Sequence, residues 1–271
     1  MGVSTRGKRQ EYLSVLFWLL TSGFWLFVDV LAGSPVDSTG QNGCRPPSAV
    51  REFGVGERFI YSIELGPLNA GVSQTEIAGI TQIDGHSCYH IVSQTTTNKA
   101  FSVLYKVDDY IESFVDVEYL ISRGIKKRIR EGNYKLNSSA ICDQERHIVI
   151  TDGDTISVPS CVHDIVSGLY SIRTIDLQPG NVITLDTYDN KKLYPSKVHV
   201  LGRERVTVQA GTFDCLIVEP VLLQSSGLFR RKGKLTMWLT DDTRKLPVLM
   251  KSEIIVGAVT MKLIEYRPGG K

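Results

Sequence analysis

The chain has 271 residues with 31 basic and 29 acidic side chains, so its formal net charge is only +2. This near balance gives no general attraction to nucleic acid, and nucleic acid is therefore excluded as a partner. The length is sufficient for one large β domain or two small ones.

The N-terminus has the order of features that is typical of an export signal. Arg6, Lys8 and Arg9 form a basic cluster, and an apolar run follows over residues 12–28. Small or modest side chains then precede a cleavage point after Ala32. We therefore predict a signal peptide over residues 1–32 and an exported, periplasmic protein. The alternative is an uncleaved anchor in the inner membrane, for which the apolar run is short of the roughly 20 residues needed.

Beyond the signal, residues 33–54 are rich in Ser, Pro, Gly and Asn without periodicity, which predicts a flexible leader. From Gly56 the chain alternates, with Phe59, Tyr61 and Ile63 on one strand face. The same alternation, punctuated by turn residues, predicts strands over residues 56–65, 72–80, 89–97, 110–115, 124–130, 134–142, 147–151, 155–158, 182–188, 198–201, 205–208, 213–221, 234–239, 248–256 and 259–266.

One segment breaks this rhythm. Over residues 162–174, Ile165, Leu169 and Ile172 recur at helical spacing, which predicts one amphipathic helix docked on the sheet. The fold is therefore expected to be mainly β: a large antiparallel curved sheet, either an open barrel or a two-sheet sandwich, with one helix. We expect a single β-rich domain over residues 55–267, with halves 55–160 and 179–267 joined by the helix and residues 268–271 as a tail.

The five cysteines are candidates for a disulfide in an oxidising compartment. Cys142 and Cys161 flank a predicted hairpin and are the expected pair, with Cys44 as the alternative partner. Cys88 and Cys215 lie in apolar strand patterns and are interpreted as buried thiols. Because no two cysteines have the short spacing of zinc or redox motifs, we expect no metal and no cofactor.

Polar residues on the predicted helix and in a late turn form the candidate functional cluster. They are Asp164, Ser167, Tyr170, Arg173, Asp242 and Arg244. Spacings of three allow the helical residues to touch in pairs, although capping by Asp164 and packing of Tyr170 are the favoured interpretation. We expect Arg173 to reach an acidic group, with Asp109, Asp116 and Asp242 as candidates.

The apolar stripe of the helix and a basic strand suggest two kinds of contact. Ile165, Leu169 and Ile172 are expected to face the concave side of the sheet and an apolar ligand, which requires the helix to act as a lid. On the strand over residues 124–130, Lys126, Arg128 and Arg130 share one face. That face is either solvated or in peripheral contact with anionic lipid.

Several motifs together resemble one known family. They include Gly56-Glu57, the helix residues Asp164, Ser167, Tyr170 and Arg173, the Gly211-Thr212-Phe213 turn, and the late segment Trp238, Asp241, Asp242, Arg244 and Pro247. Over residues 55–267 the chain resembles the exported bacterial domain-of-unknown-function family 3108. The resemblance implies an envelope location and supplies no reaction. The closing pattern is also similar, at the level of fold, to periplasmic lipoprotein carriers of the Lol type.

Three functional hypotheses follow. The first is a non-catalytic binder of an apolar or amphipathic ligand, such as a lipid, or of another envelope protein. The second is an enzyme that uses Asp164, Tyr170, Arg173 and Asp242, and the third is a scaffold subunit whose strand edges pair with a partner. An apolar cavity above about 300 Å³ under the helix favours the first. A polar cleft in which those four residues converge favours the second, and a filled core favours the third.

Overall fold

Alternating side chains build one antiparallel sheet of 14 strands in this computed structural model, which describes residues 44, 46, 51–222, 234–254 and 257–270. The predicted signal peptide and most of the leader lie outside the described residues. The strands are β1 (Arg58–Leu65), β2 (Leu68–Ile83), β3 (His86–Thr97), β4 (Asp108–Asp116), β5 (Ser122–Glu131), β6 (Tyr134–Asp143), β7 (Ile148–Thr151), β8 (Asp154–Ser157), β9 (Val182–Asp189), β10 (Lys192–Val208), β11 (Gly211–Leu222), β12 (Leu235–Thr240), β13 (Pro247–Ile254) and β14 (Gly257–Arg267). The expected fold, a mainly β antiparallel curved sheet, is confirmed.

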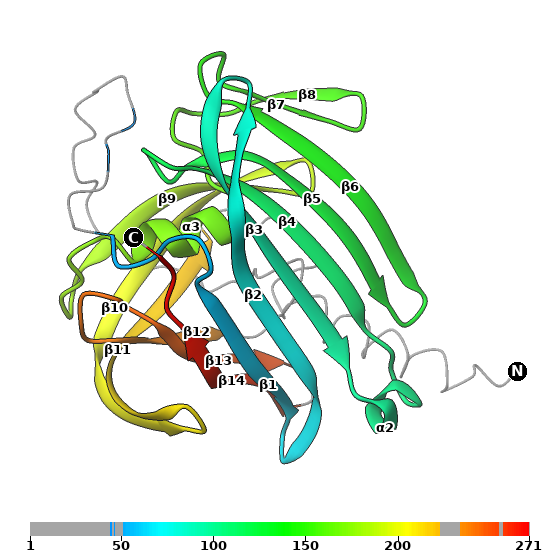
Figure 1. Ribbon diagram of the computed structural model, residues 1–271, viewed down its shortest axis with the longest axis vertical. Coiled ribbons are helices and arrows are strands. Elements are labelled where there is room, and N and C mark those ends of the chain that lie inside the picture. Colours follow the sequence, from blue (N-terminus) through cyan, green and yellow to red (C-terminus); the bar gives the residue numbers. More distant parts are fainter. Residues whose placement is uncertain (1–43, 45, 47–50, 223–233, 255–256, 271) are drawn as a thin grey trace, which may run out of the picture.

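The sheet consists of two meanders joined at their first and last strands. Strands β1 to β8 follow one another in space, as do β9 to β14, and β1 pairs with β14 to unite them. The edges are β8 and β9, so the sheet is not closed. Between the meanders the chain forms helix α3 (Ile165–Ile172), which lies within the curve of the sheet (Figure 1).

Two elements differ from the sequence expectation. The segments 198–201 and 205–208 belong to one long strand, β10, because a bulge between Val200 and Gly202 lets the strand continue through the glycine. A short helix, α2 (Lys99–Ser102), was not predicted, because four residues are too few to show a helical period.

Glycine is required at one close approach between strands. A Cβ on Gly71 in β2 would lie only 2.1 Å from the backbone oxygen of Thr96 in β3. No side chain fits there, and the register also shifts nearby, between Ile63 and Glu64 of β1.

A strap formed by residues 161–163 bridges the open seam between β5 and β9. Ser122 N donates to Val162 O at 3.1 Å, His163 N donates to Asp186 O at 2.8 Å, and Tyr188 N donates to His163 O at 2.7 Å. The buried side chains of Lys127 in β5 and Asp189 in β9 also form an ion pair. The strap therefore joins β5 of the first meander to the edge strand β9 of the second, immediately before α3 begins.

Candidate functional site

A partly open cavity of about 170 Å³ lies between α3 and the concave face of the sheet. Its walls come from both meanders and from the helix, including Ile165, Leu169 and Ile172. Leu169 and Ile172 also pack against an apolar cluster of β10, β11 and β12. The stripe that was expected to face a ligand thus lies on the cavity.

One wall of the cavity is a row of methionines on three neighbouring strands. Met261 of β14 is the register partner of Met250 in β13, and Met250 is the partner of Met237 in β12. All three line the cavity. The sequence contains four methionines, and the other one is Met1. Methionine is unbranched and polarisable, so this row forms a surface that can adapt its shape to a ligand.

Another part of the lining is formed by hydroxyl groups. Ser73 and Thr95 form a hydrogen bond of 2.8 Å between β2 and β3, and Thr75 and Ser93 form one of 3.0 Å in the same pair of strands. Ser73, Thr75 and Ser93 line the cavity. Because these hydroxyls bond to one another, the wall is polar, uncharged and internally satisfied.

The N-terminal end of α3 is held by the first pair of the candidate cluster. Asp164 is the N-cap and forms a capping box with Ser167: Asp164 Oδ1 accepts from Val166 N at 2.8 Å and from Ser167 N at 3.0 Å. Its second oxygen, Oδ2, accepts from the hydroxyl of Ser113 in β4 at 2.7 Å. The buried carboxylate of Asp164 is therefore engaged in fixing the helix to the sheet.

The C-terminal end of α3 is held by a buried ion pair between Arg173 and Glu57, and Glu57 was not among the partners expected for Arg173. Arg173 Nη1 and Nη2 donate to the two carboxylate oxygens of Glu57 at 2.8 and 2.7 Å. None of the expected partners is used: Asp116 binds Arg123, Asp242 binds Arg244, and Asp109 accepts from the backbone N–H of Arg130.

Aromatic rings surround this ion pair. The guanidinium carbon of Arg173 lies 4.7 Å from the ring centre of Phe53, 4.9 Å from that of Tyr170 and 5.3 Å from that of Phe59. Burial raises the pKa of the Tyr170 hydroxyl well above its usual range, so this side chain is neutral. Arg173 Nε also donates to the backbone oxygen of Arg244 at 3.2 Å, so all of its nitrogens have partners.

Three residues of the proposed enzyme cluster, Asp164, Tyr170 and Arg173, line the cavity, and Asp242 is not part of its lining. Asp164 and Arg173 cap opposite ends of α3, about 13 Å apart at 1.5 Å per residue. Asp242 lies in the β12–β13 turn, where it accepts from Arg244 Nε at 2.9 Å and from the hydroxyl of Thr240 at 2.7 Å. Each charged group is therefore used in a local structural contact.

The basic face of β5 is largely occupied by contacts within the protein. Arg128 pairs with Asp108, Arg130 donates to the backbone oxygens of Ile129 and Leu136, and the Lys126 ammonium lies 5.4 Å from the ring centre of Phe114. Inward-facing Lys127 alternates with these residues and is buried. The side chains of β5 alternate between the two faces of the sheet as expected, and Arg128 and Arg130 on the outer face are bound to other groups of the protein.

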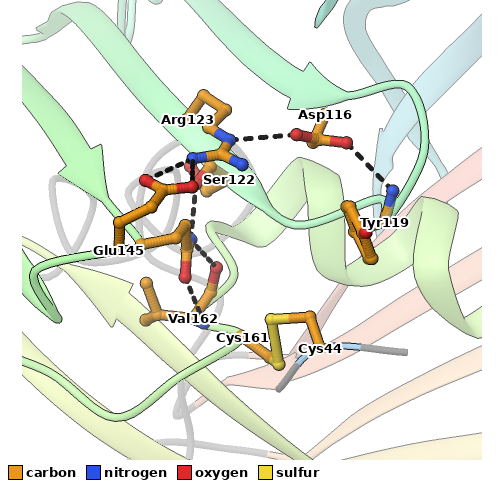
Figure 2. Close-up of a disulfide and its surroundings, with 9 residues drawn as sticks. Cys44, Asp116, Tyr119, Ser122, Arg123, Glu145, Cys161 and Val162 are labelled. Atoms are coloured by element: carbon orange, nitrogen blue, oxygen red, sulfur yellow. Dashed lines mark hydrogen bonds and ion pairs between the residues drawn. A yellow bond between two sulfur atoms is a disulfide. The ribbon is translucent and has the colours of Figure 1, made fainter. Parts of the chain in front are cut away.

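The disulfide joins Cys44 to Cys161, not Cys142 to Cys161. Cys142 is instead a buried free thiol within 3.6 Å of the Ser122 hydroxyl, and burial raises its pKa to about 12. Cys161 begins the strap, which places it away from the inward face of β6. Figure 2 shows the bond beside Val162, and it ties the leader to the strap.

The second residue after this disulfide, His163, is expected to make stability depend on pH. Burial lowers its pKa to about 4, against about 6.5 in an unfolded chain. Between pH 6.5 and 4 only the unfolded state takes up this proton, so stability is complete above about pH 7 and falls as the pH is lowered to 4. The shift corresponds to about 3 kcal/mol.

Urea denaturation at several pH values between 7 and 4 measures this dependence. His163→Gln should make the free energy of unfolding depend less on pH in this range. His90→Gln, at a partly exposed histidine that pairs with Glu112, should retain the wild-type dependence. Equal pH dependence in the wild type and His163→Gln would contradict the assignment.

No group of three or more His, Cys, Asp and Glu side chains among the described residues could hold a metal ion. Within the same residues, no helix is long and apolar enough to cross a membrane. The apolar run over residues 12–28 lies outside this part of the chain.

Comparisons with known proteins concern the fold and the family. The chain is similar to the crystal structure of a β-barrel-like protein of domain of unknown function DUF1849 from Brucella abortus, with a TM-score of 0.58 and 11% identity over 82% of this chain and 100% of that one. It also matches a candidate lipoprotein from Parabacteroides distasonis (TM-score 0.34, 11% identity, 84% of this chain and 100% of that one). A candidate exported protein with a YmcC-like fold from Bacteroides fragilis gives a TM-score of 0.32 and 12% identity over 81% of this chain and 99% of that one.

No curated protein matches the sequence. The model of the protein family of unknown function DUF3108 matches residues 60–264, most of the chain. The resemblance seen in the motifs is thereby confirmed, and the protein belongs to the DUF3108 family.

Proposed function

We propose that the protein binds a slender amphipathic molecule, without catalysis, in the cavity beneath α3. The observation that carries this proposal is the row of Met237, Met250 and Met261, which concentrates every methionine after Met1 on one cavity wall. A core that served only for stability would gain more from branched side chains with fixed rotamers. An adaptable apolar wall suits ligands of variable shape.

The size of the cavity limits the ligand. Its volume of about 170 Å³ is smaller than the roughly 300 Å³ that was expected to favour a binder of apolar or amphipathic ligands, so the space restricts the proposal to a slender ligand. It is close to the roughly 150 Å³ cavity that accepts benzene in another protein. The space therefore suits a short segment of one alkyl chain, with the rest of the molecule outside or admitted by movement of the methionines.

The charges around the cavity limit the ligand further. Asp164 and Arg173 both line it, and both are already engaged within the protein: Asp164 accepts hydrogen bonds from Ser113 and the first turn of α3, and Arg173 is paired with Glu57. A charged headgroup would find no free counter-ion in this lining, so the enclosed part of the ligand should be uncharged. Hydroxyl groups such as those of Ser73 and Ser93 can accept or donate a hydrogen bond to a neutral polar group.

Helix α3 is a fixed wall in this proposal and not a lid. Both of its ends are held by buried polar contacts, through Asp164 at the start and Arg173 at the end. Moving the helix would leave these groups buried without partners or would require both ends to open together. The route to the cavity should then pass beside the helix.

The Cys44–Cys161 disulfide supports the export part of the proposal, because disulfides persist in oxidising compartments such as the bacterial periplasm. We place the protein there as a ligand-binding component of the cell envelope.

Filling the cavity should abolish binding of an uncharged apolar probe. Benzene, whose size suits the cavity, is the probe, and isothermal titration calorimetry measures its binding. Met250→Trp should weaken its binding at least tenfold, because the larger ring occupies the cavity, whereas Met250→Leu should keep it within about threefold. Leu201→Trp, at a side chain 51% exposed on β10, is the matched surface control.

Unchanged probe binding in Met250→Trp would contradict the assignment of the site, provided that thermal unfolding shows the variant to be folded. Solvent extraction of the exported protein followed by lipid mass spectrometry then identifies what the cavity holds in the cell.

A further inference from the structure

The most exposed large apolar side chains of the described residues stand together at the tip of one turn. Residues 99–106 between β3 and β4, here named the α2 turn, contain Val103 and Leu104, which are 86% and 73% exposed. Phe101 and Tyr105 of the same turn are buried in the core cluster beneath β1 and β14. The turn is therefore apolar on both sides, one against the protein and one against solvent.

The α2 turn is held in a defined shape, so the exposure of its tip is a property of the folded protein. Asn98 caps α2 by accepting from Phe101 N at 2.8 Å, and its side-chain nitrogen donates to Asn69 O at 2.8 Å. At the other end, Leu104 N and Tyr105 N both donate to Phe101 O at 2.9 Å. Buried rings and hydrogen bonds thus present Val103 and Leu104 outward on a rigid support.

Positive charge flanks this apolar tip. Lys99 and Lys106 are both exposed, and neither forms an ion pair with another described residue. Asp108, the nearest acidic residue after the turn, is bound to Arg128. Among the described residues, the acidic groups near the turn are buried or paired, so the exposed charge at the tip is positive and complements an anionic surface.

Two neighbouring turns extend the same end of the sheet. The β1–β2 turn leads into Leu68, which is 58% exposed and lies next to the residue that Asn98 binds. The β5–β6 turn is tied to the α2 turn by Gly132 N, which donates to Lys106 O at 2.8 Å, and it continues into the exposed Lys135. Figure 1 shows α2 projecting from this end, away from α3.

We propose that the α2 turn docks the protein on an anionic lipid bilayer. Val103 and Leu104 enter the boundary between headgroups and acyl chains, and Lys99 and Lys106 lie at the lipid phosphates. A narrow apolar tip with basic flanks suits this boundary. It does not suit a protein partner, because a stable protein interface needs about 1,000 Å² of complementary surface. This inference does not depend on the ligand proposed for the cavity.

The depth of the tip is measured directly with a tryptophan placed on it. Leu104→Trp in the full chain is mixed with phosphatidylglycerol-containing vesicles whose acyl chains are brominated, and the fluorescence of the parent protein is subtracted. Quenching is expected at position 104. Leu201→Trp, at a comparably exposed position on β10, should show none. This readout reports the tip itself, whatever the N-terminal segment does.

Charge and apolarity are then tested separately. Lys99→Glu/Lys106→Glu should weaken binding to phosphatidylglycerol vesicles by roughly fivefold per lysine at low salt and much less at high salt. Val103→Asp/Leu104→Asp should weaken binding to these vesicles at least tenfold, while Leu201→Asp leaves it unchanged. These sites are exposed, so all variants should unfold at the wild-type temperature.

Equal quenching at positions 104 and 201 would overturn the proposal, and so would equal binding to purely neutral phosphatidylcholine vesicles. If Val103→Asp/Leu104→Asp instead converts a dimer into a monomer without affecting vesicle binding, the tip is a contact between two copies of the chain and the membrane assignment is wrong.

Discussion

Replacing Glu57 by leucine is expected to lower the free energy of unfolding by about 3–5 kcal/mol, because Arg173 would remain buried without a counter-charge. The side chains of Glu57 and Arg173 are 0% and 1% exposed, so water cannot compensate for the lost partner. The aromatic rings around the guanidinium can stabilise a cation only partly. Urea denaturation followed by circular dichroism measures the loss.

The matched control removes both charges. In Glu57→Leu/Arg173→Met the cost of an unpaired charge disappears, so most of the stability should return. Arg244→Met, which breaks the exposed pair with Asp242, should cost less than about 1 kcal/mol. If the double variant is as unstable as Glu57→Leu, the loss comes from the shape of the site and not from its charge.

The strands could be predicted because a sheet that buries one face has apolar residues at every second position of its strands. Phe59, Tyr61 and Ile63 are buried in the structure, while Arg58, Ile60 and Ser62, which alternate with them along β1, are only half-buried. A segment that spans about one helical turn, such as the four residues of α2, is too short to show a repeat, which explains why α2 was missed. The two segments of β10 were predicted as separate strands, because a bulge and a turn look alike in sequence.

The helix and its N-cap could be predicted because they depend on residues close together in the sequence. The residue that binds Arg173 could not be predicted in this way. Asp164 and Ser167 are three residues apart, and their capping box is a local interaction. Arg173 and Glu57 are separated by 116 residues, and only the tertiary arrangement brings them together. Glu57 was visible as a member of a motif, and no pattern in the sequence pointed to Arg173 as its partner.

The cavity wall was missed because it depends on register. Met237, Met250 and Met261 lie in three separate strands, and a shift of one residue in any pairing would turn a methionine to the other face of the sheet. The available signal was the concentration of all the methionines after Met1 in the last three strands. Cross-strand neighbours become visible only when the register is known.

The disulfide prediction failed for a related reason. Cys142 and Cys161 flank two short strands, and a returning chain was assumed to bring their sulfurs together. Cys142 points into the core from β6, and Cys161 lies on the strap beyond the hairpin. The leader was expected to be flexible, yet it supplies the partner, and its Phe53 packs 4.9 Å from the ring centre of Tyr170.

Loss of the Cys44–Cys161 disulfide is expected to lower the free energy of unfolding by about 4–5 kcal/mol, since the bond closes a loop of more than a hundred residues in the unfolded chain. The two cysteines are 117 positions apart. Urea denaturation with and without dithiothreitol measures the effect. The other three cysteines, Cys88, Cys142 and Cys215, are buried free thiols and should not respond to the reductant in the native state.

Cys44→Ser separates this bond from any other action of the reductant. It should reproduce the loss of stability and show no further change with dithiothreitol. Hydrogen exchange then locates the consequence: the amides of Val162 and His163 should exchange faster than those of β1, because the disulfide holds the strap that bridges β5 and β9. Equal stability with and without the bond would mean that hydrogen bonds alone hold the strap. In that case the leader could detach without separating β5 from β9. Only contacts such as that of Phe53 with Tyr170 would then hold the leader on the sheet.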